Sequence, residues 1–188
     1  GQAPLFYSDG TRTDLPRSFN PSTPWSRWNM YSDKVFVTLD QRFTNGWRIK
    51  MEASRLKNER KAAWGYLSSY SPVDQAGGST IEIRDNPARS VNRSFDVYAT
   101  GPFEAFGREH RAAVGLSVND YTSSLNLNTA NPNGWDRRPL NFYQLQNVPK
   151  PSQFSYTFYN TFLDAKETAV YGSIRLRIAD PLSIILGA

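Results

Sequence analysis

Strict alternation of apolar and polar residues over positions 35–54 constrains the fold of this chain more than any other feature. In residues 35–43 the odd-numbered positions carry mainly apolar side chains and the even-numbered positions carry mixed ones, as in a β-strand with two unlike faces. Asn45-Gly46 follows, and both residues tolerate the positive φ that a two-residue hairpin turn requires. Beyond it the apolar parity resumes with Trp47, Ile49, Met51 and Ala53, and the other face carries Arg48, Lys50, Glu52 and Ser54. The stretch predicts an antiparallel hairpin with one apolar and one charged face.

Composition decides which environments this hairpin suits. The mean hydropathy is −0.58, and no apolar run approaches the ~18 residues that a membrane-spanning helix needs. A transmembrane β-barrel remains compatible, because its alternating strands average to a polar composition. Cysteine is absent, which excludes disulfides, thiolate metal sites and cysteine nucleophiles. The net charge of +5 is scattered among acidic residues, so it does not indicate a nucleic-acid-binding protein.

Tight turns and long irregular stretches alternate along the chain. Turns are expected near residues 45, 104 and 180, whereas residues 1–33, 57–89 and 120–151 are polar and without sustained periodicity. Short turns at one end of the strands and long loops at the other are typical of outer-membrane barrels. The last strand would stop soon after Ser183 and leave an apolar edge without a partner, so we expect the chain to be a fragment.

Several sequence motifs, in order, carry a family resemblance. They are Leu5 to Thr13 (LFYSDGTRT), Leu39 to Trp47 (LDQRFTNGW), Phe95 to Phe103 (FDVYATGPF), Phe106 to His110 (FGREH), Val114-Gly115, Lys166 to Thr168 (KET), Tyr171-Gly172 and Leu182 to Gly187 (LSIILG). With them the chain resembles the middle of the barrel in TonB-dependent ferric siderophore receptors, in the hydroxamate and pyoverdine branch.

The resemblance implies an all-β, antiparallel up-and-down meander that is part of a 22-stranded transmembrane β-barrel with long outer loops and short inner turns. Residues 1–188 would supply about six strands, without the plug domain that contacts TonB. Implied partners are a ferric siderophore, TonB and outer-membrane lipid of a Gram-negative bacterium. The siderophore brings its iron already coordinated, so no cofactor and no protein metal ligands are expected. The isolated piece is expected to self-associate through its strand edges.

Two sets of aromatic and basic residues are candidates for function. Flat aromatic surface and arginine suit an anionic chelate, and the candidates in the long loops are Trp64, Tyr66, Trp135, Arg137, Arg138 and Tyr143. Packing of the loops against one another is the alternative for each of them. Aromatic residues at the short turns form the expected membrane-interface girdle, or edge packing in a soluble domain; they are Phe43, Trp47, Phe103 and Phe106.

Catalysis finds little support in the sequence. His110 is the single histidine, and its place beside a turn favours a structural role over a catalytic triad. Glu52 and Asp96 share their faces with basic residues, which favours an ion network over a glycosidase acid pair. Two alternatives stay open: a soluble β-sandwich or barrel that binds carbohydrate through loop tryptophans, and a β-rich hydrolase. The first requires the face of Val35, Leu39, Ile49 and Met51 to be buried.

Overall fold

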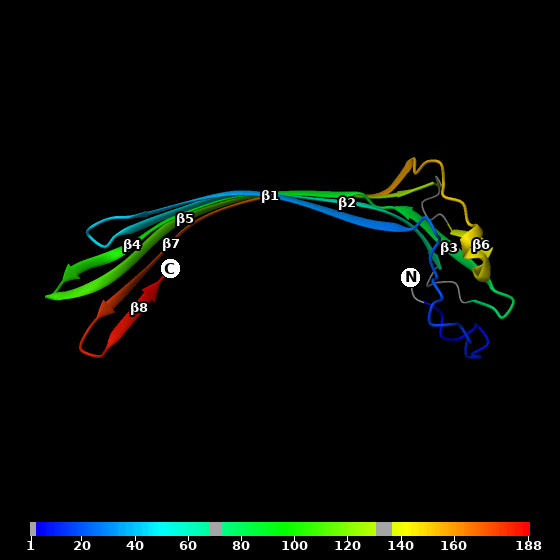
Figure 1. Ribbon diagram of the computed structural model, residues 1–188, viewed down its shortest axis with the longest axis horizontal. Helices are drawn as coiled ribbons and strands as arrows, with labels where there is room; N and C mark the ends of the chain where they lie inside the picture. The colour runs from blue at the N-terminus through cyan, green and yellow to red at the C-terminus, as the bar shows by residue number, and fades with distance from the viewer. Residues whose placement is uncertain (1–2, 68–72, 131–136) are drawn as a thin grey trace. The chain divides into compact units, whose positions relative to one another are not determined.

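The computed structural model describes residues 3–67, 73–130 and 137–188, and within them the chain is almost entirely β-strand. The strands are β1 (Arg27–Arg42), β2 (Arg48–Leu67), β3 (Gly78–Asp85), β4 (Ala88–Ala105), β5 (Arg108–Thr129), β6 (Arg137–Asn141), β7 (Tyr156–Arg177) and β8 (Ser183–Gly187), and one 3₁₀ helix, η1, spans Phe142–Asn147 (Figure 1). No helix among the described residues is long and apolar enough to cross a membrane. The predicted all-β class is confirmed.

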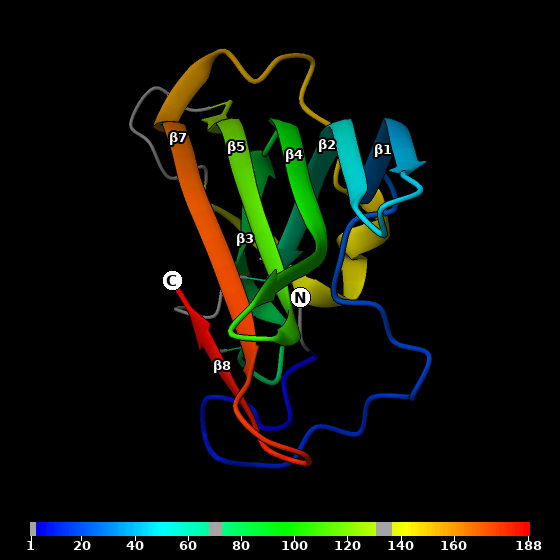
Figure 2. The same ribbon diagram turned by 90° about the vertical axis from the view of Figure 1, so that its left-hand side faces the viewer.

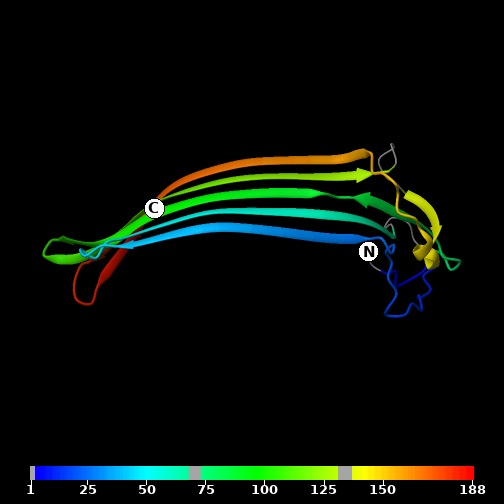
Figure 3. The ribbon, with the colours of Figure 1, turned by 45° about the horizontal axis from the view of Figure 1, so that its top comes forward.

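Strands that follow one another in the chain pair with one another in the sheet. β1 pairs with β2, and the order then continues through β4, β5, β7 and β8, as Figures 2 and 3 show for the long strands. Two further strands lie within long connections: β3 pairs antiparallel with β2, and β6 pairs antiparallel with β3. The predicted antiparallel up-and-down meander is therefore present, with β3 and β6 added to it.

The first turn differs in detail from the predicted two-residue hairpin. Phe43 N donates to Trp47 O at 2.8 Å and Gly46 N to Phe43 O at 3.1 Å, so the connection is longer by one bulged residue. Gly46 adopts φ +84°, whereas Asn45 is not among the residues with positive φ. Asn45 instead accepts a hydrogen bond from Trp47 N through its side chain. This is the three-residue loop that joins a type I turn to a glycine bulge.

The second turn lies nearer to β5 than predicted. Gly101 and Pro102 belong to β4, which ends at Ala105. Phe106 (φ 51°) and Gly107 (φ 69°) form the connection. Positive φ at both central residues is the geometry of a tight hairpin turn that matches the twist of the strands. A phenylalanine at positive φ is uncommon, so its residue type gives no signal for this turn position.

Two polar stretches that were expected to be irregular contain strand. β2 continues to Leu67, and β5 continues to Thr129. Polar residues on both faces remove the alternation that marks a strand in sequence, but they leave the backbone ladder intact. The prediction of irregular structure over 57–89 and 120–151 was wrong for these parts.

The chain divides into two compact units, which we describe separately. Unit 1 comprises residues 1–31, 59–89 and 124–162. Its core consists of Leu67, Val73, Ile81, Ile83, Phe142 and Leu145. Phe142 on η1 is 0% exposed and meets the ring of Phe19 edge to face at 5.5 Å. The long connections of the chain thus share one apolar core in this unit.

Hydrogen bonds tie the N-terminal segment of unit 1 to that core. Ser8 N donates to Val73 O at 2.8 Å. The indole Nε1 of Trp25 donates to Val148 O at 3.0 Å. The hydroxyls of Tyr7 and Tyr143 are 2.7 Å apart. Hydrogen bonds between three stretches that are distant in sequence therefore hold unit 1 together.

Unit 2 comprises residues 32–58, 90–123 and 163–188, and its apolar side chains are not covered. Val37 is 67% exposed, and exposure extends over Val35, Leu39, Met51, Phe95, Val114, Val118, Val170, Ile174 and Ile178. These residues occupy the alternate strand positions that the sequence predicts to form the apolar face. The soluble-domain alternative required the face of Val35, Leu39, Ile49 and Met51 to be buried. Ile49 is half-buried and the other three are exposed, so that requirement is not met.

The opposite face of unit 2 carries cross-strand polar contacts. Asp40 accepts hydrogen bonds from the Arg48 guanidinium. The hydroxyls of Ser54 and Ser94 are 2.7 Å apart, across the β2–β4 pair. Tyr171 Oη donates to the carboxylate of Asp96 at 3.0 Å. This charged face agrees with the alternation in the sequence.

Candidate binding site

The far end of β2 is fixed by the segment that precedes β1. Thr23 N donates to Gly65 O at 2.9 Å, and Ser22 forms an isolated antiparallel bridge with Tyr66. Ser26 Oγ accepts from Gly65 N at 3.1 Å. A Cβ on Gly65 would meet the side chain of Thr23 at 2.8 Å, so this close approach requires glycine. Trp64 and Tyr66, which flank Gly65, are thereby held on one face of β2.

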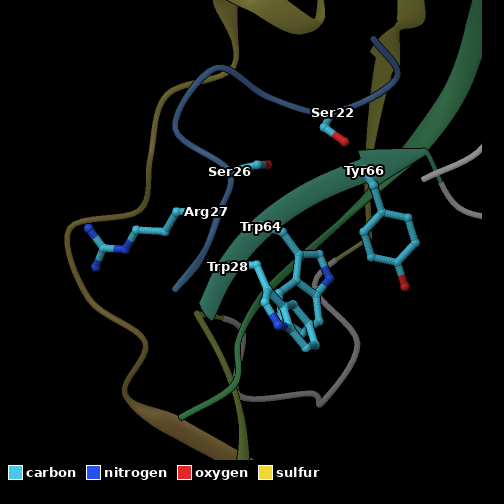
Figure 4. A pocket seen from close by; sticks show the side chains of 6 residues that line it. All are labelled: Ser22, Ser26, Arg27, Trp28, Trp64 and Tyr66. Atoms are coloured by element: carbon cyan, nitrogen blue, oxygen red, sulfur yellow. The ribbon is translucent and has the colours of Figure 1, made fainter. Parts of the chain in front are cut away.

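A pocket of about 430 Å³ opens beside these two aromatic residues. It is lined by Ser22, Ser26, Arg27, Trp28, Trp64 and Tyr66, all of them in unit 1. Figure 4 shows Trp28, Trp64 and Tyr66 on the same side of the strand, whereas the side chain of Arg27 points away from them. The volume is within the range of about 300–1,000 Å³ that is usual for small-molecule sites.

The two tryptophans of this pocket stack on each other, and a neighbouring arginine lies over one of their rings. The ring centroids of Trp28 and Trp64 are 5.3 Å apart, with an interplanar angle of 32°. The guanidinium of Arg60 lies 4.7 Å from the centroid of the Trp28 ring. Arg60 also donates to the backbone and side-chain oxygens of Asn86, which fixes its position. The arrangement presents a rigid aromatic surface next to a positive charge, which suits a flat anionic ligand.

A buried carboxylate sets the orientation of Tyr66. Glu82 lies opposite Tyr66 in the β2–β3 ladder, and the Tyr66 hydroxyl donates to it at 2.9 Å. Arg84 donates to the same oxygen at 2.6 Å, so the carboxylate charge is balanced. Burial, and then the hydrogen bond to Glu82, raise the pKa of Tyr66 above its ordinary value. The hydroxyl therefore stays protonated and the ring stays fixed at physiological pH.

Tyr143, which the structure describes, is not among the residues that line this pocket. Tyr143 is exposed on η1, and hydrogen bonding with Tyr7 is the leading cause that raises its pKa. The backbone of Arg138 pairs with Ile81 and that of Arg137 with Glu82, in the β6–β3 ladder. Trp135 lies outside the described residues. The side chains of Arg137 and Arg138 also lie outside the described part of the structure. Among the candidates whose side chains are described, Trp64 and Tyr66 come together in the pocket, and their role in binding stays a prediction.

Sequence reasoning missed Trp28, which lines the pocket, and Arg60, which lies over the Trp28 ring. Trp28 was assigned to an N-terminal loop, because residues 1–33 show no periodicity, yet it lies at the start of β1. Arg60 was counted only among scattered charges. The signal that points to Trp28 is the pair of tryptophans, Trp25 and Trp28, in a segment rich in proline. They have different roles, since Trp25 packs against the core of unit 1.

The four girdle candidates all lie at short turns of unit 2. The indole of Trp47 covers Gly101, where an added Cβ would clash with the ring. Phe103 lies 5.2 Å from the imidazole of His110. Phe43 is exposed, and Phe106 at the tip of its turn is 96% exposed. Their place relative to a membrane surface stays a prediction.

The titratable residues of unit 2 are engaged in structural contacts. His110 is 4% exposed, its Nδ1 accepts from Arg177 N at 3.0 Å, and its Nε2 lies 2.9 Å from Ala105 O. Glu52 and Asp96 line one cavity of about 270 Å³, together with Lys50, Ser94 and Tyr98. The acids lie among a lysine and tyrosine hydroxyls, which agrees with an ion and hydrogen-bond network. Within the described part of the chain, no three His, Asp or Glu side chains gather closely enough to hold a metal ion.

Comparison with known proteins gives relatives over the whole chain. It is 30% identical, over 190 residues, to the ferripyoverdine receptor of Pseudomonas aeruginosa, covering 100% of this chain and 23% of the relative. It is 29% identical to the ferric-pyoverdine BN7/BN8 receptor of Pseudomonas putida, covering 98% of this chain and 23% of the relative. No family model matches the chain. The chain spans about a quarter of the length of the relatives that it matches.

Solved structures agree with these relatives. The crystal structure of the ferripyoverdine receptor of the outer membrane of Pseudomonas aeruginosa, bound to ferripyoverdine, superposes with a TM-score of 0.82. The identity is 28%, and the match covers 98% of this chain and 24% of that one. The likeness extends from the sequence motifs to the arrangement of the strands.

Proposed function

Because the chain is a homologue of the outer-membrane ferripyoverdine receptors, which are receptors and not enzymes, we propose that it forms part of the barrel wall and outer loops of a ferric siderophore receptor. The sequence resemblance to siderophore receptors is thereby confirmed, and the carbohydrate-binding alternative has no support. In the proposal, residues 1–188 are one segment of a 22-stranded barrel. The intact receptor lies in the outer membrane of a Gram-negative bacterium and imports its ligand with energy from TonB.

The stacked aromatic pocket of unit 1 carries the proposal for ligand binding. Trp28 and Trp64 offer a flat apolar surface, Tyr66 is held in place by Glu82, and the Arg60 guanidinium lies over the first ring. A ferric siderophore is a compact, oxygen-rich chelate whose iron needs no protein ligand. The pocket supplies apolar contact and positive charge instead. Trp135, Arg137, Arg138 and Tyr143 are proposed as further contacts.

The exposed apolar face of unit 2 supports the membrane location. Its apolar residues recur on five neighbouring strands, and the face ends at the short turns with Phe43, Trp47, Phe103 and Phe106. A transmembrane strand needs about 9–11 residues. The apolar positions that run along β1 and β7 and one residue past their ends, residues 35–43 and 170–178, have this length. We assign this face to lipid and the four aromatic residues to the inner interface.

Quenching of tryptophan fluorescence tests the ligand proposal. The receptor that contains this chain is titrated with ferric pyoverdine, a ferric hydroxamate siderophore and the iron-free forms. We expect saturable quenching by a ferric siderophore, and about 30-fold weaker binding after Trp64→Ala, because central aromatic contacts contribute about 2 kcal/mol. Arg60→Gln is expected to weaken binding about 10-fold, by loss of one charge contact.

A matched control separates binding from folding. Trp47→Phe alters a tryptophan of unit 2 and is expected to leave the dissociation constant unchanged. Trp25→Phe removes the hydrogen bond to Val148 and tests whether a tryptophan that packs the core also matters. If no ferric siderophore quenches the receptor, or if Trp64→Ala binds as tightly as the parent, the pocket is not the ligand site.

A further inference from the structure

A pocket beside the short turns of unit 2 gathers basic side chains on the charged face of the sheet. Its volume is about 270 Å³, and all of its lining residues belong to unit 2. They come from β5, from β7 and from the turn and strand that follow, and β5, β7 and β8 are neighbours in the sheet (Figure 2). The lining residues include Glu109, His110, Arg111, Arg175, Arg177 and Ser183.

The imidazole of His110 fixes the backbone around this pocket. Its Nδ1 accepts a hydrogen bond from Arg177 N at 3.0 Å. Because Nδ1 accepts, the neutral ring carries its proton on Nε2, which donates to Ala105 O at 2.9 Å. Ser183 is the partner of Arg177 in the β7–β8 ladder, so it adjoins the same pocket from the next strand. The strands that carry the arginines are thereby held in one arrangement.

Two arginines of the pocket have no counter-charge. Asp180 pairs with Arg177 and, at 3.7 Å, with Arg108, so one carboxylate is shared between two guanidinium groups. Among the residues that the structure describes, neither Arg111 nor Arg175 has a hydrogen-bond or ion-pair partner for its side chain. Both are exposed. Their donors are therefore available to a ligand.

Glu109 reduces the positive charge of the pocket without cancelling it. Its side chain is exposed on the same face, and attraction between exposed charged groups is screened by water. Together with the adjoining Arg108 and Asp180, the cluster holds four arginines and two carboxylates, which leaves a formal charge of +2. An anion from outside can satisfy this excess.

We propose that Arg111 and Arg175 bind an anionic group of the ferric siderophore as it leaves the receptor. This inference rests on the proposed function and on its assignment of the short turns to the inner side of the membrane. Guanidinium groups hold anionic oxygen atoms through paired, charged hydrogen bonds. The pocket is smaller than the about 300–1,000 Å³ of sites that enclose a small ligand, so it contacts one oxygen-rich edge of the chelate. A limited contact suits a ligand that must be released again.

A fluorophore beside the pocket tests binding directly. This chain contains no cysteine, so Leu182→Cys, in the turn before β8, gives one labelling site in it. The labelled full-length receptor is titrated in detergent with ferric citrate, a small anionic ferric chelate whose iron quenches a nearby fluorophore. We expect saturable quenching, and about 10-fold weaker binding after Arg111→Gln with Arg175→Gln, because two charged hydrogen-bond donors are lost.

Uptake of radiolabelled ferric siderophore by whole cells tests the role of this pocket in transport. The double glutamine variant is expected to import about 10-fold more slowly than the parent. Its dissociation constant, from quenching of the tryptophans, is expected to stay within about twofold, because the aromatic pocket of unit 1 is unchanged. Arg111→Lys with Arg175→Lys keeps the charge but not the planar fork, so an intermediate rate is expected.

The matched control removes two cations from the same face of unit 2, outside the pocket. Lys34→Gln with Arg42→Gln, on β1, is expected to leave the label quenching and the uptake rate within about twofold of the parent. The proposal is wrong if ferric citrate does not quench the label, or if the control variant loses as much as the double glutamine variant. A lower melting temperature of the ligand-free double variant would also overturn it, because the arginines would then hold an acidic segment of the receptor itself.

This site and the proposed function fail in different ways. If no ferric siderophore quenches the tryptophans of the parent receptor, the receptor function is refuted, and this inference with it. If the parent binds and imports a ferric siderophore, and the double glutamine variant imports it at the same rate, this site alone is refuted.

Discussion

The two units of this chain differ in the solvent exposure of their apolar side chains. Unit 1 encloses them: Ile81, Ile83 and Phe142 are inaccessible to solvent within a shared core. Unit 2 displays them: Val37 and Val170 stand exposed on a sheet with no second layer over that face. Similar residue types thus serve as internal packing in one unit and as an outer surface in the other.

This difference shows that hydrophobic alternation alone does not tell where a side chain ends up. An uncovered apolar face of this size is an interaction surface or a route to aggregation. In the proposed receptor the surface is matched to lipid, whereas unit 1 works in water and must bury its core. The comparison leads to four predictions, given from the largest expected effect to the smallest.

Removal of the largest core side chain is expected to affect unit 1 most. Phe142→Ala leaves a cavity among Ile81, Leu145 and Phe19, and the free energy of unfolding of unit 1 is expected to fall by about 3–5 kcal/mol. Hydrogen exchange of the β3 and β6 amides measures this loss. Phe36→Ala in unit 2, an exposed phenylalanine, is the control, with an expected change below about 0.5 kcal/mol. Equal effects would show that the two units do not differ in packing.

A charge on the apolar face of unit 2 is expected to be costly only in a bilayer. Leu39→Lys is expected to reduce the free energy of folding into lipid vesicles by about 2–4 kcal/mol, and less nearer the interface. Thr38→Lys, on the opposite face of the same strand, is the matched control and is expected to cost less than about 1 kcal/mol. Urea titration in vesicles measures both, and identical losses would contradict the assignment of the faces.

The contact between Trp47 and Gly101 is expected to be sensitive to size. Gly101→Val places side-chain atoms where the indole lies, and overpacking of this kind costs about 1–3 kcal/mol. The emission maximum of Trp47 should shift as the ring is displaced. In the double variant with Trp47→Ala the cost of the valine should largely disappear. If the cost persists without the indole, the glycine is required for another reason.

The smallest of the four expected effects is the loss of stability of unit 1 at alkaline pH, which depends on Tyr66. Its pKa is raised above the ordinary value of 10.0, so its stabilising contribution is complete below pH 10.0 and is lost as the pH rises through the folded-state value. We expect the unfolding midpoint of unit 1 to fall at alkaline pH, and to fall less in Tyr66→Phe. Ultraviolet absorbance of the phenolate follows the titration. Ionisation of Tyr66 together with the exposed tyrosines would contradict the hydrogen bond to Glu82.

Unit 2 was largely predictable from sequence, and unit 1 was not. Alternation over residues 35–54 fixed the hairpin, the faces and the turn region, because a strand with unlike faces has a period of two. Turn details were less accessible: Phe106 at positive φ gives no signal in a single sequence. In unit 1 the strands β3 and β6 are short, and their partners are set by contacts between distant segments. Trp64 and Tyr66 were found by residue type, whereas Trp28 was missed because the alternation in its strand begins only at residue 35.

The hydrogen bonds between distant stretches of unit 1 have a consequence for how the proposed ligand binding would change. The hydroxyls of Tyr7 and Tyr143 are hydrogen-bonded, Ser8 N donates to Val73 O, and Trp25 Nε1 donates to Val148 O. Each of these hydrogen bonds joins two stretches that are far apart in the sequence. If one of these stretches were replaced by that of a related protein, its hydrogen-bond partners in the other stretches would no longer match it. We therefore expect that recombination changes the proposed ligand only when three stretches are exchanged together. They are residues 5–25, 65–83 and 140–148.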